Sequence, residues 1–145
     1  MNDNWDRKFM DLARTVAGWS KDPSTKVGCV IVGPAREVRS MGYNGIPRGV
    51  RDTSDRMQRP VKYDWFCHAE ENAVANAARV GQSLDGCTAY TTLHPCNVCA
   101  RMLIQAGVAR IVTPLAEIPA RWAEQFTIAK VMLVEADVLL TEGQF

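Results

Sequence analysis

The chain has 145 residues, a length that suits one domain with its own hydrophobic core, and we expect residues 1–145 to form a single domain. Hydrophobic residues make up 47% of the sequence and charged residues 23%, a balance that is typical of globular proteins and excludes an intrinsically disordered chain. The 17 basic and 16 acidic side chains give a formal net charge of +1. Proteins that bind DNA or RNA polymers usually show a basic excess, so we expect no nucleic acid polymer as a partner.

The first part of the chain predicts a helix followed by a hairpin. Over residues 4–19, apolar side chains recur at steps of three and four residues, which is the spacing of a helix whose apolar face ends at Trp19. Residues 27–32 form a short apolar, β-branched run and predict a buried strand. Residues 37–43 predict the second arm of the hairpin.

A polar segment, residues 48–62, follows the hairpin. We interpret it as an exposed surface loop with at most a helical turn. The alternative interpretation is that one or two of its cations hold a phosphate. Its cations are Arg48, Arg51, Arg56, Arg59 and Lys62.

Helices and strands alternate through the rest of the chain. The patterns predict, in chain order, a helix at residues 69–80, a strand at 88–93, a helix at 95–106, a strand at 108–113, a helix at 119–135 and a last strand at 138–141. The complete order, α-β-β-α-β-α-β-α-β, predicts an α/β fold in which helices cover both faces of a sheet.

The cysteines and the apolar segments indicate a compartment. The sequence has five cysteines, an odd number, and the polar residues 1–11 do not resemble the apolar region of a signal peptide. No apolar run reaches the length that a membrane-spanning helix requires. We therefore expect a protein of the reducing cytoplasm that does not associate with a membrane. In that compartment, clustered cysteines indicate metal binding or catalysis more often than disulfides.

Two short motifs carry most of the chemistry. His68-Ala69-Glu70 lies at the start of one predicted helix, and Pro95-Cys96-Asn97-Val98-Cys99 lies at the start of the next. One helix, one loop and one strand separate them, which is the shortest route that returns the chain to the same end of a sheet. The two helix starts can therefore face each other. Cys96 and Cys99 project from one side of the first turn, where unpaired N–H groups and the helix dipole favour thiolates.

These residues predict a catalytic zinc site. His68, Cys96 and Cys99 supply three ligands, which leave one tetrahedral position for water, as in catalytic rather than structural zinc sites. We expect one zinc ion per chain. Glu70, two residues beyond His68, is the candidate proton carrier, because a carboxylate there can take a proton from the activated water and deliver protons to a ring nitrogen and a leaving amine. The predicted reaction releases ammonia.

Two other interpretations of the cysteine pair fit less well. A thioredoxin-like redox pair is disfavoured because Pro95 precedes the pair and a His-x-Glu motif lies upstream. A structural zinc would need a fourth ligand, and the nearby candidates Cys67 and His94 each adjoin a ligand, which strains joint coordination. We expect Cys29 and Cys87 to be small buried hydrophobes.

The two motifs together resemble the signature of the zinc-dependent nucleobase deaminases, H-x-E followed by P-C-x-x-C. Three further segments resemble the deoxycytidylate (dCMP) deaminase branch of the cytidine deaminase superfamily: residues 22–28 (DPSTKVG), 42–49 (GYNGIPRG) and 104–108 (IQAGV). The likeness spans about residues 4–113. It implies a three-layer α/β/α cytidine-deaminase-like fold with a mixed, mostly five-stranded sheet.

The resemblance also implies ligand contacts. It implies that Asn44 hydrogen-bonds the pyrimidine or the sugar and that the backbone of Ala69 helps to fix the base. In this branch, the Gly-Tyr-Asn-Gly segment borders an allosteric nucleotide site at a subunit interface, where dCTP activates and dTTP inhibits. Homo-oligomers, from dimers to hexamers, are therefore expected. Further candidate contacts are Ser24, Thr25, Lys26 and His94 for the substrate, and Gly42, Tyr43, Gly45 and Arg48 for an effector or a phosphate.

Three positions leave alternatives open. His94 stands where the branch more often has Phe, against the amino-bearing edge of the substrate. It either changes the exocyclic group that is accepted or packs at the end of a strand. Arg121 or Trp122 either caps the pocket or, as we expect for Trp122, packs in the core on an amphipathic helix. Tyr43 either stacks on a base or fills the inner face of its strand.

The leading hypothesis for function is hydrolytic deamination of a free cytosine nucleotide, dCMP to dUMP, with release of ammonia. A second hypothesis is deamination of a modified pyrimidine or purine nucleotide, which His94 leaves open, whereas the near-neutral charge argues against adenosine in tRNA. A third hypothesis is a zinc-containing protein that senses nucleotides without turnover. Glu70 argues against the third, because a binding module needs no proton carrier.

Overall fold

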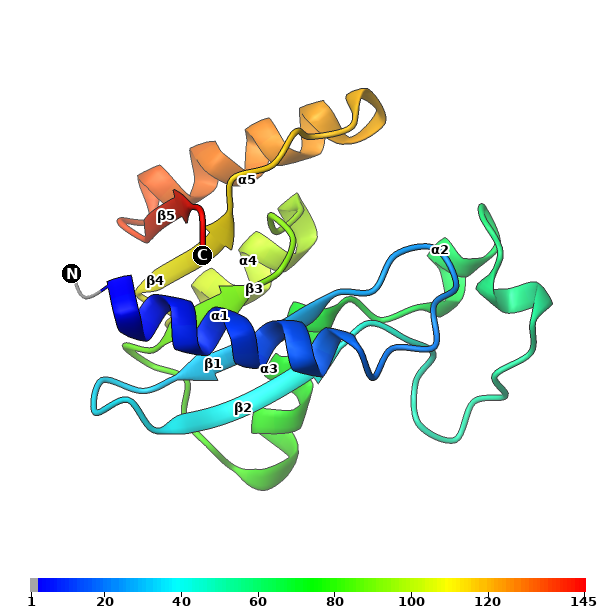
Figure 1. Cartoon of the computed structure of the whole chain (residues 1–145), viewed down its shortest axis with the longest axis horizontal. Helices are drawn as coiled ribbons and strands as arrows, with labels where there is room; N and C mark the ends of the chain where they lie inside the picture. The colour runs from blue at the N-terminus through cyan, green and yellow to red at the C-terminus, as the bar shows by residue number, and fades with distance from the viewer. Residues whose placement is uncertain (1–2) are drawn as a thin grey trace.

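The computed structural model describes residues 3–145, and a five-stranded sheet forms its centre (Figure 1). β1 is antiparallel to β2 and β3, whereas β3, β4 and β5 run parallel to one another, so the expected mixed sheet is confirmed. The spatial order is β2-β1-β3-β4-β5. The strands are β1 (Gly28–Val32), β2 (Val38–Tyr43), β3 (Thr88–Thr91), β4 (Arg110–Pro114) and β5 (Leu139–Gly143).

Helices cover both faces of the sheet, which confirms the three-layer architecture. α1 (Asp3–Ala17) packs on the face that carries Val30, Tyr90 and Val112. The opposite face carries alternate residues of the same strands, including Ile31 and Ile111, and packs against the three helices α3 (Ala69–Val80), α4 (Asn97–Gln105) and α5 (Ala123–Glu135). Alternation along each strand therefore gives the sheet two apolar faces and two cores.

Short helical turns lie in the connections: η1 (Asp55–Met57) and α2 (Lys62–Trp65) before α3, and η2 (Ala120–Trp122) before α5. The segment at 48–62 is thus mostly loop, as expected. Within residues 3–145, no helix combines the length and the apolar character needed to cross a membrane.

The predicted element bounds agree closely with the structure in the helices that matter for function. α3 has the predicted bounds and ends at Gly81, whose φ of 74° lies in the left-handed region that favours glycine. The expectation for Trp19 is wrong. α1 ends at Ala17, and Trp19 is 55% exposed and contacts the ring of Tyr43 edge-on at 6.2 Å.

Close packing of β2 against the N-terminus of α3 depends on Gly42. A Cβ atom at this position would lie 2.4 Å from the carbonyl oxygen of Ala69 and 2.4 Å from the backbone nitrogen of Ala73. Only glycine leaves room for this approach. Gly42, a candidate effector contact by resemblance, therefore also has a structural role in placing the start of α3.

A buried ion pair joins α1 to the sheet. Arg110 on β4 donates to both carboxylate oxygens of Asp6, at 2.9 and 2.7 Å, and the hydroxyl of Tyr90 donates to Asp6 at 2.8 Å. Burial alone would raise the pKa of the Asp6 carboxyl, but the hydrogen bonds from Arg110 and Tyr90 outweigh burial and lower it. The folded state is therefore stabilised by the ionised carboxylate.

Replacing Asp6 by Asn should lower the free energy of unfolding by about 2 kcal/mol, because Arg110 loses its charged partner inside the protein. The pKa of Asp6 is lower in the folded chain than in the unfolded one, so its contribution is complete above about pH 4 and is lost as the pH falls through the folded pKa. Urea unfolding at several pH values measures both effects. Asp11→Asn on the same helix is the control, because its pair with Arg14 is exposed and should matter little. Equal losses in both variants would contradict this account.

Candidate active site

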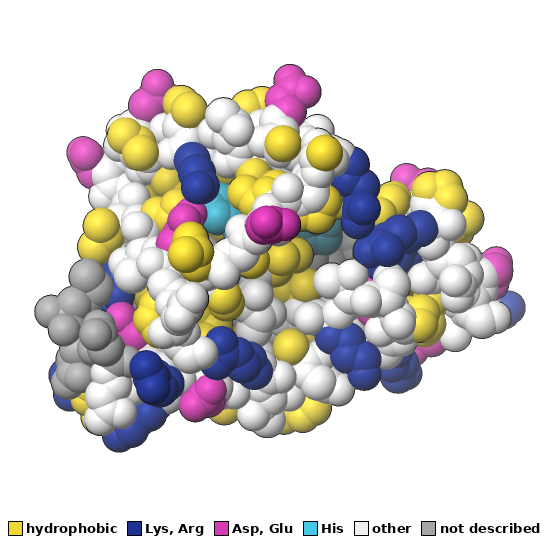
Figure 2. Space-filling view, turned by 45° about the horizontal axis from the view of Figure 1, so that its top comes forward, with side chains coloured by type: hydrophobic (Ala, Val, Ile, Leu, Met, Phe, Trp, Pro, Cys, Tyr) yellow, Lys and Arg dark blue, Asp and Glu magenta, His cyan; other side chains and the backbone are white. Residues whose placement is uncertain are grey.

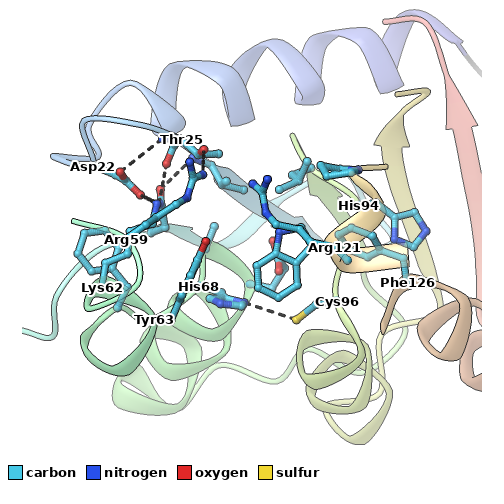
Figure 3. A pocket seen from close by; sticks show the side chains of 18 residues that line it. Asp22, Thr25, Arg59, Lys62, Tyr63, His68, His94, Cys96, Arg121 and Phe126 are labelled. Atoms are coloured by element: carbon cyan, nitrogen blue, oxygen red, sulfur yellow. Dashed lines mark hydrogen bonds and ion pairs between the residues drawn. The ribbon is translucent and has the colours of Figure 1, made fainter. Parts of the chain in front are cut away.

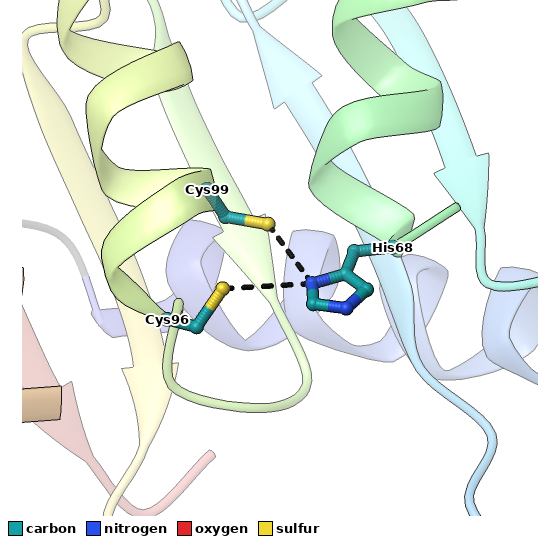
Figure 4. Close-up of side chains that lie close together, drawn as sticks. All are labelled: His68, Cys96 and Cys99. Atoms are coloured by element: carbon teal, nitrogen blue, oxygen red, sulfur yellow. Dashed lines mark hydrogen bonds between the residues drawn. The ribbon is translucent and has the colours of Figure 1, made fainter. Parts of the chain in front are cut away.

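α3 and α4 begin at the same end of the sheet, and their first residues bring the predicted metal ligands together. His68 precedes α3 at its N-cap position, Cys96 is the N-cap residue of α4, and Cys99 lies in the first turn of α4. Figure 4 shows the imidazole of His68 pointing toward the two sulfur atoms. His68 Nδ1 lies 3.3 Å from Cys99 Sγ and 3.5 Å from Cys96 Sγ, and the three ligand atoms lie within 4.8 Å of one another.

This arrangement fits a zinc ion. Tetrahedral zinc with Zn–N of about 2.1 Å and Zn–S of about 2.3 Å places its nitrogen and sulfur ligands about 3.6 Å apart. The observed nitrogen–sulfur distances are close to that value. One imidazole and two thiolates suit zinc, and a set of three protein ligands is typical of catalytic sites that keep one position open. His68, Cys96 and Cys99 are therefore the residues that would hold the metal.

The side chains of the three ligands differ in pKa. The hydrogen bond from Cys99 lowers the pKa of Cys96 to about 4, and the hydrogen bond to Cys96 raises the pKa of His68 to about 9. The pKa of Cys99 is raised because its thiol donates a hydrogen bond to Cys96 and is buried. Zinc binds a neutral imidazole and thiolates, so its binding displaces the protons that His68 and Cys99 hold.

Glu70, the second residue of α3, is buried beside the ligands and only 4% exposed. Thr91, the last residue of β3, is fully buried and donates a hydrogen bond from Oγ1 to Glu70 Oε1 at 2.8 Å. Burial raises the pKa of the Glu70 carboxyl. A carboxyl group held in this position can both accept and release a proton beside the metal ligands. Thr91 was not expected from the sequence, because its position within the strand gave no chemical signal.

A cavity of about 240 Å³ opens above these residues, and His68, Glu70 and Cys96 lie among the side chains that line it (Figure 3). Apolar and aromatic side chains, including Phe66, Leu93 and Phe126, form much of its wall. The space-filling view shows a hollow with histidine at its floor and Lys or Arg side chains along one rim (Figure 2). A mostly apolar lining with a few polar groups is typical of a site for a small organic ligand.

Four of the six candidate substrate contacts line the cavity, namely Thr25, Asn44, Ala69 and His94. Ser24 and Lys26 lie outside the lining of this cavity in the described structure. The Ser24 hydroxyl instead donates to Asp22 Oδ1 at 2.9 Å and accepts a hydrogen bond from Lys62 at 2.8 Å. Ser24 therefore stabilises two residues of the cavity wall, Asp22 and Lys62.

Asn44 lines the cavity, but most of its hydrogen-bonding capacity is used within the chain. Its Oδ1 accepts from the backbone nitrogen of Val27 at 2.8 Å. Its Nδ2 donates to the Thr25 carbonyl at 2.9 Å and to Asp22 Oδ2 at 3.2 Å. Asn44 therefore fixes the loop at residues 22–27, and one lone pair of Oδ1 is left for a ligand. A contact from Asn44 to the pyrimidine or the sugar stays a prediction.

His94 packs at the end of β3 and faces the C-terminal part of the chain. Its Nδ1 lies 2.9 Å from the Pro95 carbonyl, its Nε2 lies 3.7 Å from Glu142 Oε1, and its ring contacts Phe126 edge-on at 5.2 Å. Burial lowers the pKa of His94. Nδ1 faces a backbone carbonyl, whereas Nε2 is buried without a hydrogen-bond partner in the described part of the chain, and both interpretations of His94 stay open.

The candidate effector contacts lie away from the cavity lining. Tyr43 is 41% exposed beside Trp19, so it does not fill an inner face. Arg48 donates to Asn76 Oδ1 at 2.8 Å, and Gly45 pairs with Cys67 in an isolated β-bridge. Roles for these residues in regulation by dCTP and dTTP, and the expected oligomer, stay predictions.

Two segments outside the motifs complete the mouth of the cavity. Tyr63 in α2 and Trp122 in η2 contact each other edge-on, with ring centroids 5.6 Å apart and planes at 81°. The expectation that Trp122 packs in the core is wrong, because it is only partly buried and lines the cavity. Of the charged residues that line the mouth, Arg59 and Lys62 were candidates only as members of a cation-rich loop, and Arg121 only as an alternative cap.

The sequence matches the model of the cytidine and deoxycytidylate deaminase zinc-binding region over residues 3–115. The chain belongs to this family. It is 40% identical to a protein of Aliivibrio fischeri described as an uncharacterized deaminase in the luxG 3′ region, over 97% of this chain and 95% of that protein. It is 39% identical to the deoxycytidylate deaminase of Mus musculus over 74% of this chain, and the match spans 63% of the mouse protein.

The fold is also similar to a solved structure. The apo crystal structure of the dCMP deaminase from cyanophage S-TIM5 superimposes with a TM-score of 0.79 and 25% sequence identity, covering 99% of this chain and 100% of the phage chain. The family assignment accounts for the His68, Cys96 and Cys99 cluster as its zinc-binding region.

Cys96→Ser should lose most of its zinc on dialysis, because a hydroxyl is a much weaker zinc ligand than a thiolate. The wild-type chain should hold about one zinc ion per chain under the same conditions. Metal analysis by mass spectrometry measures both. Cys67→Ser is the matched control, because Cys67 adjoins His68 but lies outside the cluster. Loss of zinc from the Cys67 variant would contradict a site with three protein ligands.

Proposed function

We propose that this chain catalyses the zinc-dependent hydrolytic deamination of dCMP to dUMP. The observation that supports this most is the position of Glu70, a buried carboxyl group beside a three-ligand zinc site at the floor of a cavity. The relatives named as deoxycytidylate deaminases support dCMP as the substrate. A sensor without turnover would not need this buried carboxyl group.

The reaction exchanges the exocyclic amine of cytosine for the oxygen of water. A carbon–oxygen bond forms, the carbon–nitrogen bond breaks, and ammonia leaves. Zinc, when bound to His68, Cys96 and Cys99, supplies Lewis-acid activation of the water. Glu70 accepts one proton from the attacking water and delivers it to the adjacent ring nitrogen. It then accepts the second proton of the same water and delivers it to the leaving amine.

The protein around Glu70 prepares it for this role. Thr91 donates a hydrogen bond to one carboxylate oxygen of Glu70 at 2.8 Å, and the N-terminal turn of α3 fixes the backbone of Glu70. The apolar wall keeps bulk water away from the carboxyl group. Glu70 therefore exchanges protons with the substrate rather than with the solvent. Phe66 and Leu93 contribute to that wall.

The zinc-loaded protein should release ammonia from dCMP, and Glu70→Gln should lose activity by a factor on the order of 10² to 10⁴ while keeping its zinc. A panel of dCMP, a modified pyrimidine nucleotide and purine nucleotides, followed by ammonia release and ultraviolet absorbance, measures the substrate preference. Metal content and thermal unfolding of the variant serve as controls. Faster turnover of a purine nucleotide than of dCMP, or full activity in Glu70→Gln, would contradict the proposal.

Thr91→Val should lower kcat about tenfold with little change in KM, because one hydrogen bond to the proton carrier is worth about that factor. Valine has nearly the same shape as threonine, so the core should stay packed. Thr91→Ser keeps the hydroxyl and should restore most of the lost kcat. Steady-state kinetics of both variants distinguish the hydrogen bond from packing. If serine and valine variants lose kcat equally, the hydroxyl does not position Glu70.

A further inference from the structure

The mouth of the cavity carries three cations, and the chain neutralises one of them. Lys62 Nζ lies 2.8 Å from Asp22 Oδ2, and the two side chains are 7% and 1% exposed. Lys62 also donates to Ser24 Oγ at 2.8 Å. This buried pair contributes almost no net charge to the cavity.

Arg59 and Arg121 line the cavity as Lys62 does, but unlike Lys62 both are exposed. Arg59 donates from Nη2 to Thr25 Oγ1 at 3.0 Å, a neutral partner. The guanidinium of Arg121 lies 6.0 Å from the ring centroid of the neighbouring Trp122. Among the ion pairs within 4.0 Å that residues 3–145 form, none involves Arg59 or Arg121. Two positive charges therefore remain available to a ligand.

The two arginines come from separate segments that meet at the mouth. Arg59 precedes α2, and Arg121 belongs to η2. The contact between Tyr63 and Trp122 joins these segments. Figure 3 shows both guanidinium groups on the side of the pocket near Thr25, whereas His68 and Cys96 lie on the opposite side of the view.

This charge pattern suits a phosphate monoester. A guanidinium group presents a planar set of donors that matches phosphate oxygens, and a phosphate monoester carries about two negative charges at pH 7. The hydroxyl of Thr25 can add one more donor. With the base of the nucleotide beside Glu70, a placement that rests on the proposed function, the sugar and its 5′-phosphate would extend toward the mouth.

We infer that Arg59 and Arg121 together bind the 5′-phosphate of the substrate and so select nucleoside monophosphates over nucleosides. Arg121 lies beyond residues 3–115, the part of the chain that matches the family model. The segment after β4 thus supplies one half of the phosphate site, and the loop before α2 supplies the other half.

Steady-state kinetics with dCMP and deoxycytidine test the inference. Arg59→Gln and Arg121→Gln should each lower kcat/KM for dCMP about tenfold, mostly through KM, and the double variant about a hundredfold. kcat/KM for deoxycytidine should not change. Added salt should raise the KM for dCMP in the wild type more than in the double variant. An equal loss for both substrates, or no loss for dCMP, would overturn the inference.

Arg56→Gln is the matched control. Arg56 belongs to the same loop, but its guanidinium stacks 3.9 Å from the ring centroid of Trp65 and donates to the Arg51 carbonyl, outside the cavity lining. This variant should keep the wild-type preference for dCMP. If it loses that preference as the other variants do, the effect comes from the general charge of the loop, and the inference fails.

Calorimetric binding of dUMP and deoxyuridine to the zinc-loaded protein separates this inference from the proposed function, because it needs no turnover. The wild type should bind dUMP more tightly than deoxyuridine, and the double variant should lose that difference. Equal binding of the two ligands by the wild type would overturn the phosphate site even if dCMP is deaminated. A preference for dUMP that depends on both arginines would stand even if no substrate releases ammonia.

Discussion

The N-termini of α3 and α4 meet at one end of the sheet, and the chemistry of the site depends on that meeting. β3 lies between β1 and β4, so the chain that leaves β3 enters α4 next to the helix that starts at His68. Glu71 accepts a hydrogen bond from the backbone nitrogen of His68 at 3.0 Å and fixes the first turn of α3. The absence of a side chain at Gly42 lets β2 pack against the same turn. Backbone packing thus places the imidazole within reach of both sulfur atoms.

A second constraint comes from the buried carboxylate of Asp22. It accepts hydrogen bonds from Ser24, Asn44 and Lys62, residues that are far apart in the sequence. Burial alone would raise its pKa, but the hydrogen bonds from Lys62 and Ser24 outweigh burial and lower it. Asp22 therefore stays ionised and holds the loop at residues 22–27 against the start of α2. These hydrogen bonds connect the residues that form this side of the cavity wall, which suits a site that must orient a small ligand.

The sequence allowed the metal ligands, Glu70 and the three-layer fold to be predicted, because these depend on local patterns. His-x-Glu and Cys-x-x-Cys place their side chains through the geometry of a single helical turn, and the bounds of α3 follow from composition and Gly81. Trp19 was mispredicted because the helical spacing of apolar residues continues in the sequence beyond the end of α1. Trp122 was mispredicted because that spacing begins in the sequence before the start of α5. Thr91 could not be identified, and Arg59 could not be singled out among the cations of its loop, because their partners, Glu70 and Thr25, are distant in the chain.

Chemistry and ligand choice come from different parts of the molecule. The metal ligands and Glu70 are held by helix starts that pack on the sheet, so they tolerate little movement. The mouth is built from the loop before α2 and from η2. These segments contact each other through Tyr63 and Trp122, and neither contributes a strand to the sheet. Substitutions in these two segments can change the size and charge of the mouth without moving the ligands. The motifs therefore account for the class of reaction, and we expect the two segments at the mouth, which lie outside the motifs, to determine the choice of substrate.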